Sequence, residues 1–286
     1  MDVANTIAEC RRLREALGPD VAFVPTMGAL HRGHTALIEA ARAEGRPVVV
    51  SIFVNPTQFG ANEDIEKYPR PLEEDLAACR AAGAAFVFNP PAQEMYPPAA
   101  EAVLVDVPAL TGVLEGRHRP GHFRGVCRVV AKLFYIVRPG VAYFGRKDFQ
   151  QLRVIEAMTA ALDMPVQIVG VPTVRDDDGL ALSSRNVYLT PDERARALAI
   201  PRALNRAVEM VAAGEKQTDR LLASARNILL DMGNLGHVPL SIDYIATVDP
   251  QSLQAVDRLE GSVLMAVAAR VGNTRLIDNM LLEPPG

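Results

Sequence analysis

The sequence predicts an α/β fold, a Rossmann-like doubly wound parallel sheet followed by a second, smaller α+β domain. Three observations support this prediction. Short β-branched apolar runs alternate with helical patterns up to about residue 175, polar segments follow several of these runs, and the composition changes after that point. Such alternation is typical of a parallel sheet with helices on both faces. We therefore expect a larger domain over residues 1–175 and a smaller one over residues 176–286.

The elements of the larger domain follow from their hydrophobic periodicity. Short apolar runs bounded by polar or glycine-containing segments indicate buried strands, and a spacing of three to four residues indicates helices. The expected strands are residues 21–25, 47–54, 84–89, 141–145 and 166–174. The expected helices are residues 6–17, 35–43, 72–82, 125–137 and 148–162.

The smaller domain begins after a charged run that ends in glycine, residues 175–179. This composition indicates a turn and a domain boundary. Thr190 and Pro191 then mark a helix start, because proline suits the first helical position. Two helices are expected beyond it, followed by short strands at residues 241–248, 262–269 and 274–278.

Composition excludes several classes of protein. The chain has 286 residues, 30 basic and 34 acidic side chains and a net charge of -4, so no overall basic field favours a nucleic acid partner. The three cysteines lie far apart without metal-type spacing, which suits free thiols in a reducing compartment. The start lacks the apolar core of a signal peptide, and the apolar run 263–269 is too short to cross a bilayer. We expect a cytoplasmic protein that does not enter a membrane.

Residues 25–34, PTMGALHRGH, are the most informative segment of the chain. Gly28 and Gly33 let the backbone turn tightly and approach a ligand, and His31 and His34 stand three residues apart. A helix start offers N–H groups and a positive dipole end to an anion. Histidines near a helix start also serve as caps, but the preceding strand and following helix favour a site for the phosphates of a nucleotide.

Two further segments combine cationic and hydroxyl groups. Lys147 and Asp148 follow an expected strand, so the lysine suits a phosphate and the acid a ribose hydroxyl, although such a pair is also typical of a helix start. Residues 182–185, LSSR, suit a triphosphate, and the same composition is found in ordinary polar hinges. Their position after strands of the same sheet favours binding in both cases.

Other polar groups remain open to more than one interpretation. Gln58 and Gln151 are neutral amides that suit a small polar substrate. Surface solvation is the better explanation of each taken singly, and only their position beside the nucleotide loops favours binding. Glu74 and Asp75 can reach a magnesium ion through water, but an acid pair at a helix start is the simpler explanation. Residues 114–124 are an active-site lid or a solvated loop.

Four motifs together resemble the pantothenate synthetase (pantoate-beta-alanine ligase) family of the nucleotidyltransferase superfamily. They are VPTMGALHRGH at residues 24–34, SIFVNPTQF at 51–59, YFGRKDFQQL at 143–152 and VPTVRDDDGLALSSRN at 171–186. The resemblance covers nearly the whole chain in the right order. It implies an ATP-dependent condensation of pantoate with β-alanine to pantothenate, through a pantoyl adenylate, with release of pyrophosphate and AMP. It further implies a homodimer that needs Mg²⁺, with residues 1–175 binding nucleotide and pantoate and residues 176–286 forming a lid.

The resemblance also implies roles for individual residues. The catalytic histidine matches His34, and His31, Lys147 and Arg185 are expected to stabilise charge on the phosphates with it. The implied ATP contacts are Met27, Gly28, Ala29, Leu30, His31, Arg32, Gly33, His34, Gly145, Arg146, Lys147, Asp148, Val174, Leu182, Ser183, Ser184 and Arg185. Gln58 and Gln151 match pantoate-binding glutamines, and Gln58 also lies near the β-alanine position. No metal ligand is implied by residue.

The chain departs from the family pattern at three positions. Arg146 stands where an acid is expected, Phe149 where tyrosine is usual and Leu182 where methionine is common. None of these changes removes a group that the chemistry needs. Arg146 does change the charge beside the expected nucleotide site.

Overall fold

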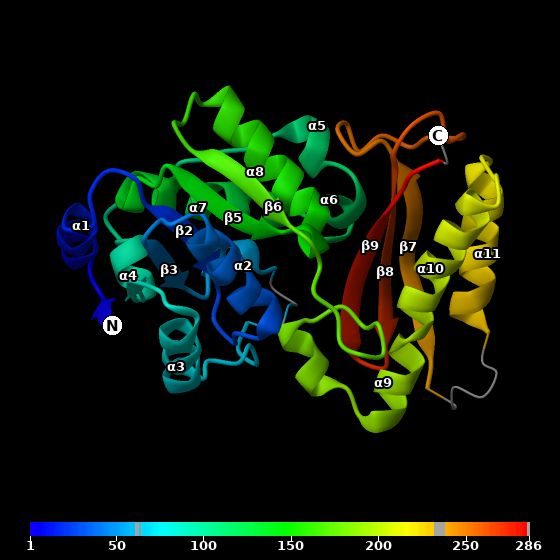
Figure 1. The fold of residues 1–286 in the computed structure, drawn as a ribbon, viewed down its shortest axis with the longest axis horizontal. Coiled ribbons are helices and arrows are strands. Elements are labelled where there is room, and N and C mark those ends of the chain that lie inside the picture. The colour runs from blue at the N-terminus through cyan, green and yellow to red at the C-terminus, as the bar shows by residue number, and fades with distance from the viewer. Residues whose placement is uncertain (61–62, 64, 232–237, 285–286) are drawn as a thin grey trace. The chain divides into compact units, whose positions relative to one another are not determined.

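The computed structural model describes residues 1–60, 63, 65–231 and 238–284 (Figure 1). The chain forms two compact units. The first comprises Met1–Thr111, Arg119–Arg146 and Gln151–Thr173, and the second comprises Gly112–His118, Lys147–Gln150 and Val174–Gly286. The second unit thus includes two short segments from earlier in the chain. A single boundary in the sequence therefore cannot divide the two units. The functions expected for residues 1–175 and 176–286 stay predictions.

Within the described residues, the first unit contains a parallel six-stranded sheet with the order β1-β4-β3-β2-β5-β6. The strands are β1 Asp2–Ala4, β2 Ala22–Thr26, β3 Val48–Ile52, β4 Phe86–Phe88, β5 Val141–Gly145 and β6 Gln167–Val171. The strand order reverses direction between β2 and β5, so the doubly wound α/β prediction is confirmed.

Some strand predictions need correction. The three-residue strand β1 was missed, because so short a segment carries no readable periodicity. The strand predicted over residues 166–174 ends at Val171, since Pro172 follows and lacks the N–H that a continuing ladder needs. The runs predicted at residues 47–54 and 84–89 are also longer than β3 and β4.

Helices join the strands of the first unit. The longer ones are α1 Ile7–Glu15, α2 Arg32–Ala43, α3 Leu72–Ala82, α7 His122–Val137 and α8 Phe149–Ala161, with short helices α4 Ala92–Met95 and α5 Pro108–Thr111 and the 3₁₀ turn η1 Pro56–Gln58. Helices α2 and α7 each begin three residues earlier than predicted. In α2 the reason is local, because His31 caps the helix and brings Arg32 and Gly33 into its first turn.

Alternate residues of β2 pack against opposite faces of the sheet. Ala22 and Val24 belong to a buried cluster with Leu37 and Ile38 of α2. Phe23 between them faces the other way, with its ring centroid 6.4 Å from that of Phe134 in α7. This alternation follows from the two-residue period of a strand, and burial on both faces explains why β2 reads as a continuous apolar run.

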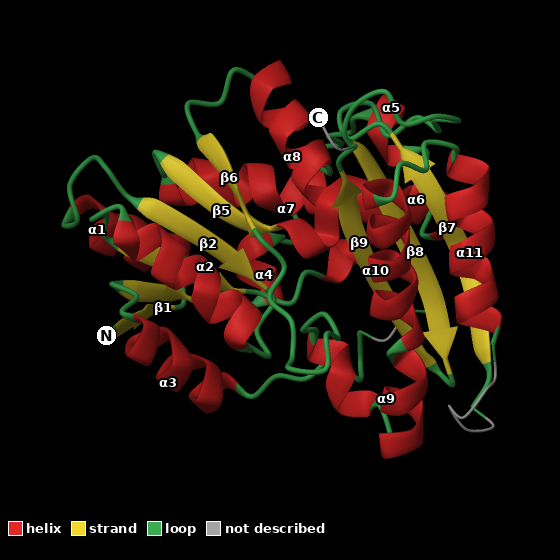
Figure 2. Cartoon of the chain, turned by 45° about the vertical axis from the view of Figure 1, so that its right-hand side comes forward, coloured by secondary structure: helices red, strands yellow, loops and turns green. Residues whose placement is uncertain are grey.

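The second unit has a three-stranded antiparallel sheet in its described part, with the order β7-β8-β9 (Figure 2). Its elements are β7 Leu240–Val248, β8 Val263–Val271, β9 Thr274–Leu282, α6 Leu114–His118, η2 Arg146–Asp148, η3 Ser184–Tyr188, α9 Pro191–Ala197, α10 Ala199–Ala212 and α11 Thr218–Leu230, with Arg146 itself counted in the first unit. Apolar residues of α10, α11 and the sheet form a shared core. The predicted α+β character is confirmed.

Two details of the second unit differ from the prediction. Three helices, not two, follow Thr190 among the described residues, since the helix capped by Thr190 ends at Ala197 and a second begins at Ala199. The strand predicted to end at Asp278 continues as β9 to Leu282. Asp278 is only 4% exposed, and Arg175 neutralises it through two hydrogen bonds of 2.7 and 2.9 Å. Among the helices described, none has the length and apolar character needed to traverse a bilayer.

Candidate active site

The polar segments singled out in the sequence follow four strands that are neighbours in the sheet order, β3, β2, β5 and β6. The Met27–His34 loop follows β2, and Arg146 follows β5. Between these two strands the sheet reverses its order of connection. Open α/β sheets bind ligands outside the carboxyl ends of their strands at this switch point. The fold therefore puts the Met27–His34 loop, called the HxGH loop below after His31, Gly33 and His34, where a nucleotide site is expected.

The two histidines of this loop fix each other's geometry. His31 is the N-cap of α2, and its Nδ1 accepts a hydrogen bond from the Gly33 N–H at 3.1 Å. The Nδ1 of His34 accepts one from the His31 N–H at 3.3 Å, and the ring centroids lie 4.1 Å apart. Because both Nδ1 atoms accept, the neutral rings carry their proton on Nε2. Each imidazole is thereby set up as a hydrogen-bond donor.

The backbone of the loop before α2 is held from inside the protein. The N–H groups of Gly28, Ala29 and Leu30 each have a partner there. Gly28 donates to the Thr26 hydroxyl at 3.2 Å, and Ala29 and Leu30 donate to the two carboxylate oxygens of Asp75 at 2.9 and 2.7 Å. These three residues precede the first turn of α2, so the expectation that the helix start binds a phosphate stays a prediction.

Asp75 is a residue whose role the sequence did not reveal. It stands in the first turn of α3, as a helix-start acid would, but it is only 2% exposed and both of its oxygens hold the HxGH loop. Burial raises the pKa of Asp75 despite the two backbone hydrogen bonds. Glu74 beside it is exposed. The sequence gives no signal for this contact, because residues 29 and 75 meet only through the packing of α2 and α3.

Gln58 contacts the same loop. It ends the turn η1, where the side chain of Asn55 caps the backbone N–H of Thr57. The amide nitrogen of Asn55 donates to the Gln58 Oε1 at 3.0 Å, and the Gln58 Nε2 donates to the Met27 sulfur at 3.0 Å. Sequence reasoning assigned Asn55 no role, although an asparagine before proline is a recognisable turn signal. The structure thus brings Gln58 to Met27.

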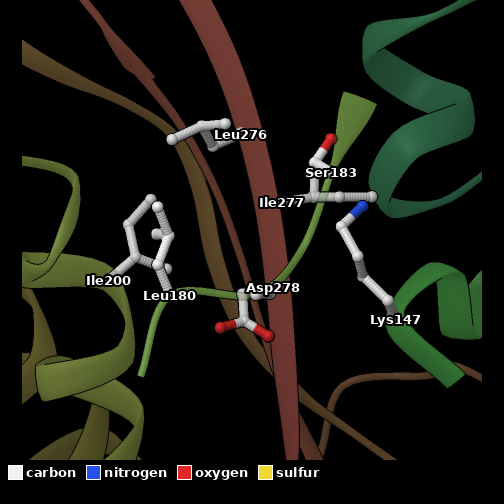
Figure 3. Close-up of a pocket in the computed structure, with 8 residues that line it drawn as sticks. Lys147, Leu180, Ser183, Ile200, Leu276, Ile277 and Asp278 are labelled. Atoms are coloured by element: carbon white, nitrogen blue, oxygen red, sulfur yellow. The ribbon is translucent and has the colours of Figure 1, made fainter. Parts of the chain in front are cut away.

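Lys147 and Ser183 line one small pocket of the second unit (Figure 3). Asp278 and Ile277 of β9 contribute to its walls, and the lysine amine is directed toward Ile277. Asn279 of the same strand donates to the Lys147 carbonyl at 2.8 Å, which holds the turn that carries the lysine. Two of the expected ATP contacts are therefore neighbours.

The remaining expected ATP contacts of the second unit form an ordered turn. The backbone N–H of Leu182 donates to the Val174 carbonyl at 3.0 Å. Ser183 caps η3 by accepting from the Arg185 N–H at 3.3 Å. Ser184 and Arg185 lie half-buried in the first turn of η3. The capped turn expected of a polar hinge is present, and it is compatible with phosphate binding.

Other singled-out residues are placed as follows. Gln151 is half-buried in the first turn of α8 in the first unit, and Asp148 ends η2, with an oxygen 3.7 Å from the Lys147 amine. Arg146 is exposed and donates to the Gly170 carbonyl at 3.1 Å. Residues 114–124 are not a solvated loop, because this segment forms α6 and the start of α7 and contains the buried Glu115, and the lid interpretation stays a prediction.

The expected site residues therefore divide between the units. The HxGH loop, Gly145, Arg146, Gln58 and Gln151 lie in the first, while Lys147, Asp148, Val174 and residues 182–185 lie in the second. Direct contacts join Gln58 to the HxGH loop within the first unit, and one pocket joins Lys147 to Ser183 within the second.

Comparisons with known proteins agree on one family. The family model described as Pantoate-beta-alanine ligase matches residues 2–281. The pantothenate synthetase of Pelotomaculum thermopropionicum is 50% identical over 286 residues, 99% of each chain. A bifunctional pantoate ligase/cytidylate kinase of Gloeobacter violaceus is 49% identical over 286 residues, which are 99% of this chain and 55% of that longer protein.

Solved structures give the same result. The crystal structure of pantothenate synthetase from Thermus thermophilus has a TM-score of 0.92 and 46% identity, covering 99% of this chain and 100% of that one. The pantoate-beta-alanine ligase of Francisella tularensis, complexed with beta-gamma ATP and beta-alanine, has a TM-score of 0.78 and 31% identity, covering 98% and 97% of the two chains. With sequence, fold and the order of its motifs in agreement along almost its whole length, the chain belongs to the pantoate-beta-alanine ligase family.

Proposed function

We propose that this chain joins pantoate to β-alanine in two steps, with ATP consumed in the first. In that step a pantoate carboxylate oxygen attacks the α-phosphorus of ATP, and pyrophosphate leaves. In the second the β-alanine amine attacks the carbonyl carbon of the pantoyl adenylate, AMP leaves and the nitrogen loses a proton. The overall ATP-dependent ligation is the reaction of the family. Adenylation makes chemical sense because a free carboxylate is a poor acceptor for an amine.

The paired histidines at the switch point support this mechanism best. With Nδ1 held by backbone N–H groups, His31 and His34 act through Nε2–H, as donors to negative charge. Charge builds up on the phosphate oxygens as the carboxylate attacks, and fixed donors stabilise it without reorganising. We assign this role to both histidines, with Lys147 and Arg185 of the second unit supplying positive charge to the leaving pyrophosphate. The other ATP contacts implied by the family resemblance complete the nucleotide site.

Gln58 and Gln151 are proposed to bind pantoate, and Gln58 also to lie beside β-alanine. The Gln58 residue is only 8% exposed, and its side chain is fixed by Asn55 and Met27. An amide of this kind pairs with hydroxyl and carboxylate groups through both of its ends. The Francisella relative was solved with beta-alanine, which agrees with a site for this substrate.

Mg²⁺ is proposed to enter with ATP. No group of three or more His, Cys, Asp or Glu side chains suited to a metal occurs among the described residues, and both Asp75 oxygens are engaged by backbone N–H groups. The acidic residues described therefore suit a Mg²⁺ ion that is held mainly by the phosphates of the substrate, as Mg²⁺ often is. They do not suit an ion enclosed by protein ligands alone. Bound there, the ion would neutralise the phosphates, and the protein's own part is to position the nucleotide beside it.

Three broader features are inferred from the family resemblance. They are a homodimer, a cytoplasmic location and a lid role for the second unit, which would protect the adenylate from water. The buried free cysteines agree with a reducing compartment. Light scattering on the purified protein distinguishes one chain from two.

The test is an incubation with ATP, pantoate and β-alanine, followed by mass analysis of the products. We expect pantothenate and AMP in equal amounts. When β-alanine is left out, a single turnover should still release pyrophosphate. A dinucleotide product without any need for an amine would instead identify an adenylyltransferase. ATP binding without pyrophosphate release would identify a nucleotide sensor.

A further inference from the structure

We infer that Glu63, Arg119 and His122 form a chain of hydrogen bonds that positions Gln58 for its substrate. None of the three belongs to the motifs that indicated the function, and all lie in the first unit. The inference concerns positioning, not chemistry, and it rests on the proposed role of Gln58 in binding pantoate.

The contacts run without interruption from a loop to the turn η1. The two carboxylate oxygens of Glu63 accept from the Nε and an NH2 nitrogen of Arg119, each at 2.7 Å. The remaining Arg119 nitrogen lies 3.1 Å from the Nε2 of His122, and the His122 Nδ1 lies 2.9 Å from the Gln58 carbonyl oxygen. His122 and Gln58 are each 8% exposed.

Chemistry fixes the direction of every bond in this chain. An arginine guanidinium only donates, so the His122 Nε2 must accept. The ring proton then sits on Nδ1 and is donated to the Gln58 carbonyl. Burial acts to raise the pKa of Glu63, but its bonds with Arg119 outweigh this effect and lower it, so the carboxylate is ionised. Glu63 orients Arg119, Arg119 selects the tautomer of His122, and His122 holds Gln58.

The turn that carries Gln58 needs such external support. Its own backbone hydrogen bond, from the Gln58 N–H to the Asn55 carbonyl, is long at 3.5 Å. Asn55 and Met27 hold only the side chain of Gln58. The bond from His122 is the one contact among those described that fixes its carbonyl, and so the direction in which the amide leaves the backbone.

The experiment compares apparent Michaelis constants for pantoate and ATP. His122→Phe keeps a flat ring but removes both nitrogens, and we expect the KM for pantoate to rise about tenfold, the effect of one lost hydrogen bond. The KM for ATP should stay within about twofold of the parent value, because the described contact of Gln58 with the nucleotide loop goes to the Met27 sulfur, a weak acceptor. His122→Asn keeps a donor near the Nδ1 position and should recover most of the loss. His118→Phe is the matched control, because His118 lies outside the chain, and both constants should stay unchanged.

Two further measurements separate the possible failures. Gln58→Ala tests the proposed pantoate site itself: if its KM for pantoate is normal, that site is wrong whatever His122 does. If Gln58→Ala raises the constant and His122→Phe does not, the positioning inference is overturned. Glu63→Gln, on a partly exposed residue, replaces His122→Phe if that variant fails to fold. Nitrogen-15 NMR reads the tautomer directly, and a proton on Nε2 of neutral His122 would also refute the chain.

Discussion

At the scale of single residues, the site depends on which atom of each side chain is already occupied. His31 and His34 present Nε2–H because backbone N–H groups take up their Nδ1 atoms. Adding a second proton to either ring would convert that Nδ1 from acceptor to donor and break the cap of α2. For the role proposed above for His34, this arrangement suits stabilisation of charge better than transfer of a proton.

The first prediction concerns His34 and Lys147. His34→Ala and Lys147→Ala should each leave a folded protein and lower adenylate formation by about 10² to 10³, the usual cost of one fixed donor to a developing charge. Pyrophosphate release with ATP and pantoate measures this rate. Near-normal rates in both variants would refute the assignment, and His118→Ala, outside the proposed site, serves as the control.

Gln151 gives a prediction of a different kind. Gln151→Ala should raise the requirement for pantoate much more than that for ATP, because its amide is assigned to the acid and not to the nucleotide. Steady-state kinetics with each substrate varied in turn decide this. Equal changes in both constants would count against a pantoate role.

The buried carboxylate of Asp75 gives a prediction about the rate of pyrophosphate release. Asp75→Asn keeps one acceptor for the HxGH loop but turns an amide N–H₂ toward the other backbone donor, so we expect pyrophosphate release to fall by about tenfold or more. Glu74→Gln, which changes the exposed neighbour, should leave the rate unchanged. A normal rate in Asp75→Asn would show that the loop does not need the carboxylate.

The pH dependence of stability gives an independent check on Asp75. Its pKa in the folded protein is raised above the usual 3.8, so folding favours the protonated form. The contribution of Asp75 to stability is therefore largest at low pH and declines as pH rises through the raised pKa. Asparagine does not titrate, so the Tm of Asp75→Asn relative to the parent should increase as the pH rises above the usual pKa of 3.8. A constant or decreasing difference would contradict the raised pKa.

At the scale of elements, the turn η1 and the helix α7 approach each other unusually closely. A Cβ built on Gly125 would lie 2.2 Å from the Thr57 carbonyl oxygen and 2.6 Å from the Gln58 Cα. The Gly125 carbonyl also accepts from the Asn55 side chain at 3.1 Å. Glycine at residue 125 is therefore what lets a helix support the turn that carries Gln58.

Gly125→Ala tests this packing. The added methyl group must push η1 away from α7, and we expect a loss of about 1–3 kcal/mol in the free energy of unfolding, typical of an overpacked core. The KM for pantoate should rise in the same variant. Gly261→Ala is the control, since a Cβ there meets nothing within 4 Å. Equal unfolding free energies for the two variants would show that the contact relaxes without strain.

At the scale of the whole molecule, the fold buries all three thiols away from solvent. The three cysteines, Cys10, Cys79 and Cys127, are free and each is 0% exposed. Burial raises the pKa of each thiol to about 12. Since only the thiolate reacts readily, we expect these buried cysteines to be unreactive in the native protein.

A thiol reagent near neutral pH should therefore leave the native protein unlabelled. In denaturant the same reagent should modify three cysteines per chain, as mass spectrometry would count. Rapid labelling of any cysteine in the native protein would mean that its surroundings open far more often than a packed core does.

The sequence by itself determined the fold class, the identity of the family and the order of the motifs along the chain. These properties are local: a buried strand is an apolar run, a helix has its period, and a loop such as residues 25–34 carries its glycines and histidines together. Helix starts were less exact where the cap was unusual, as with His31 in α2.

Only the tertiary structure decided which side chains support the site. Asp75 meets Ala29 and Leu30 across 46 and 45 residues, and His122 meets Gln58 across 64. Nothing in the local pattern of an acid at a helix start distinguishes a solvated carboxylate from one that holds a loop. Such contacts depend on how helices pack over a sheet, so the partner of each polar group and the proton on each histidine are set by the folded chain and not by its neighbours in sequence.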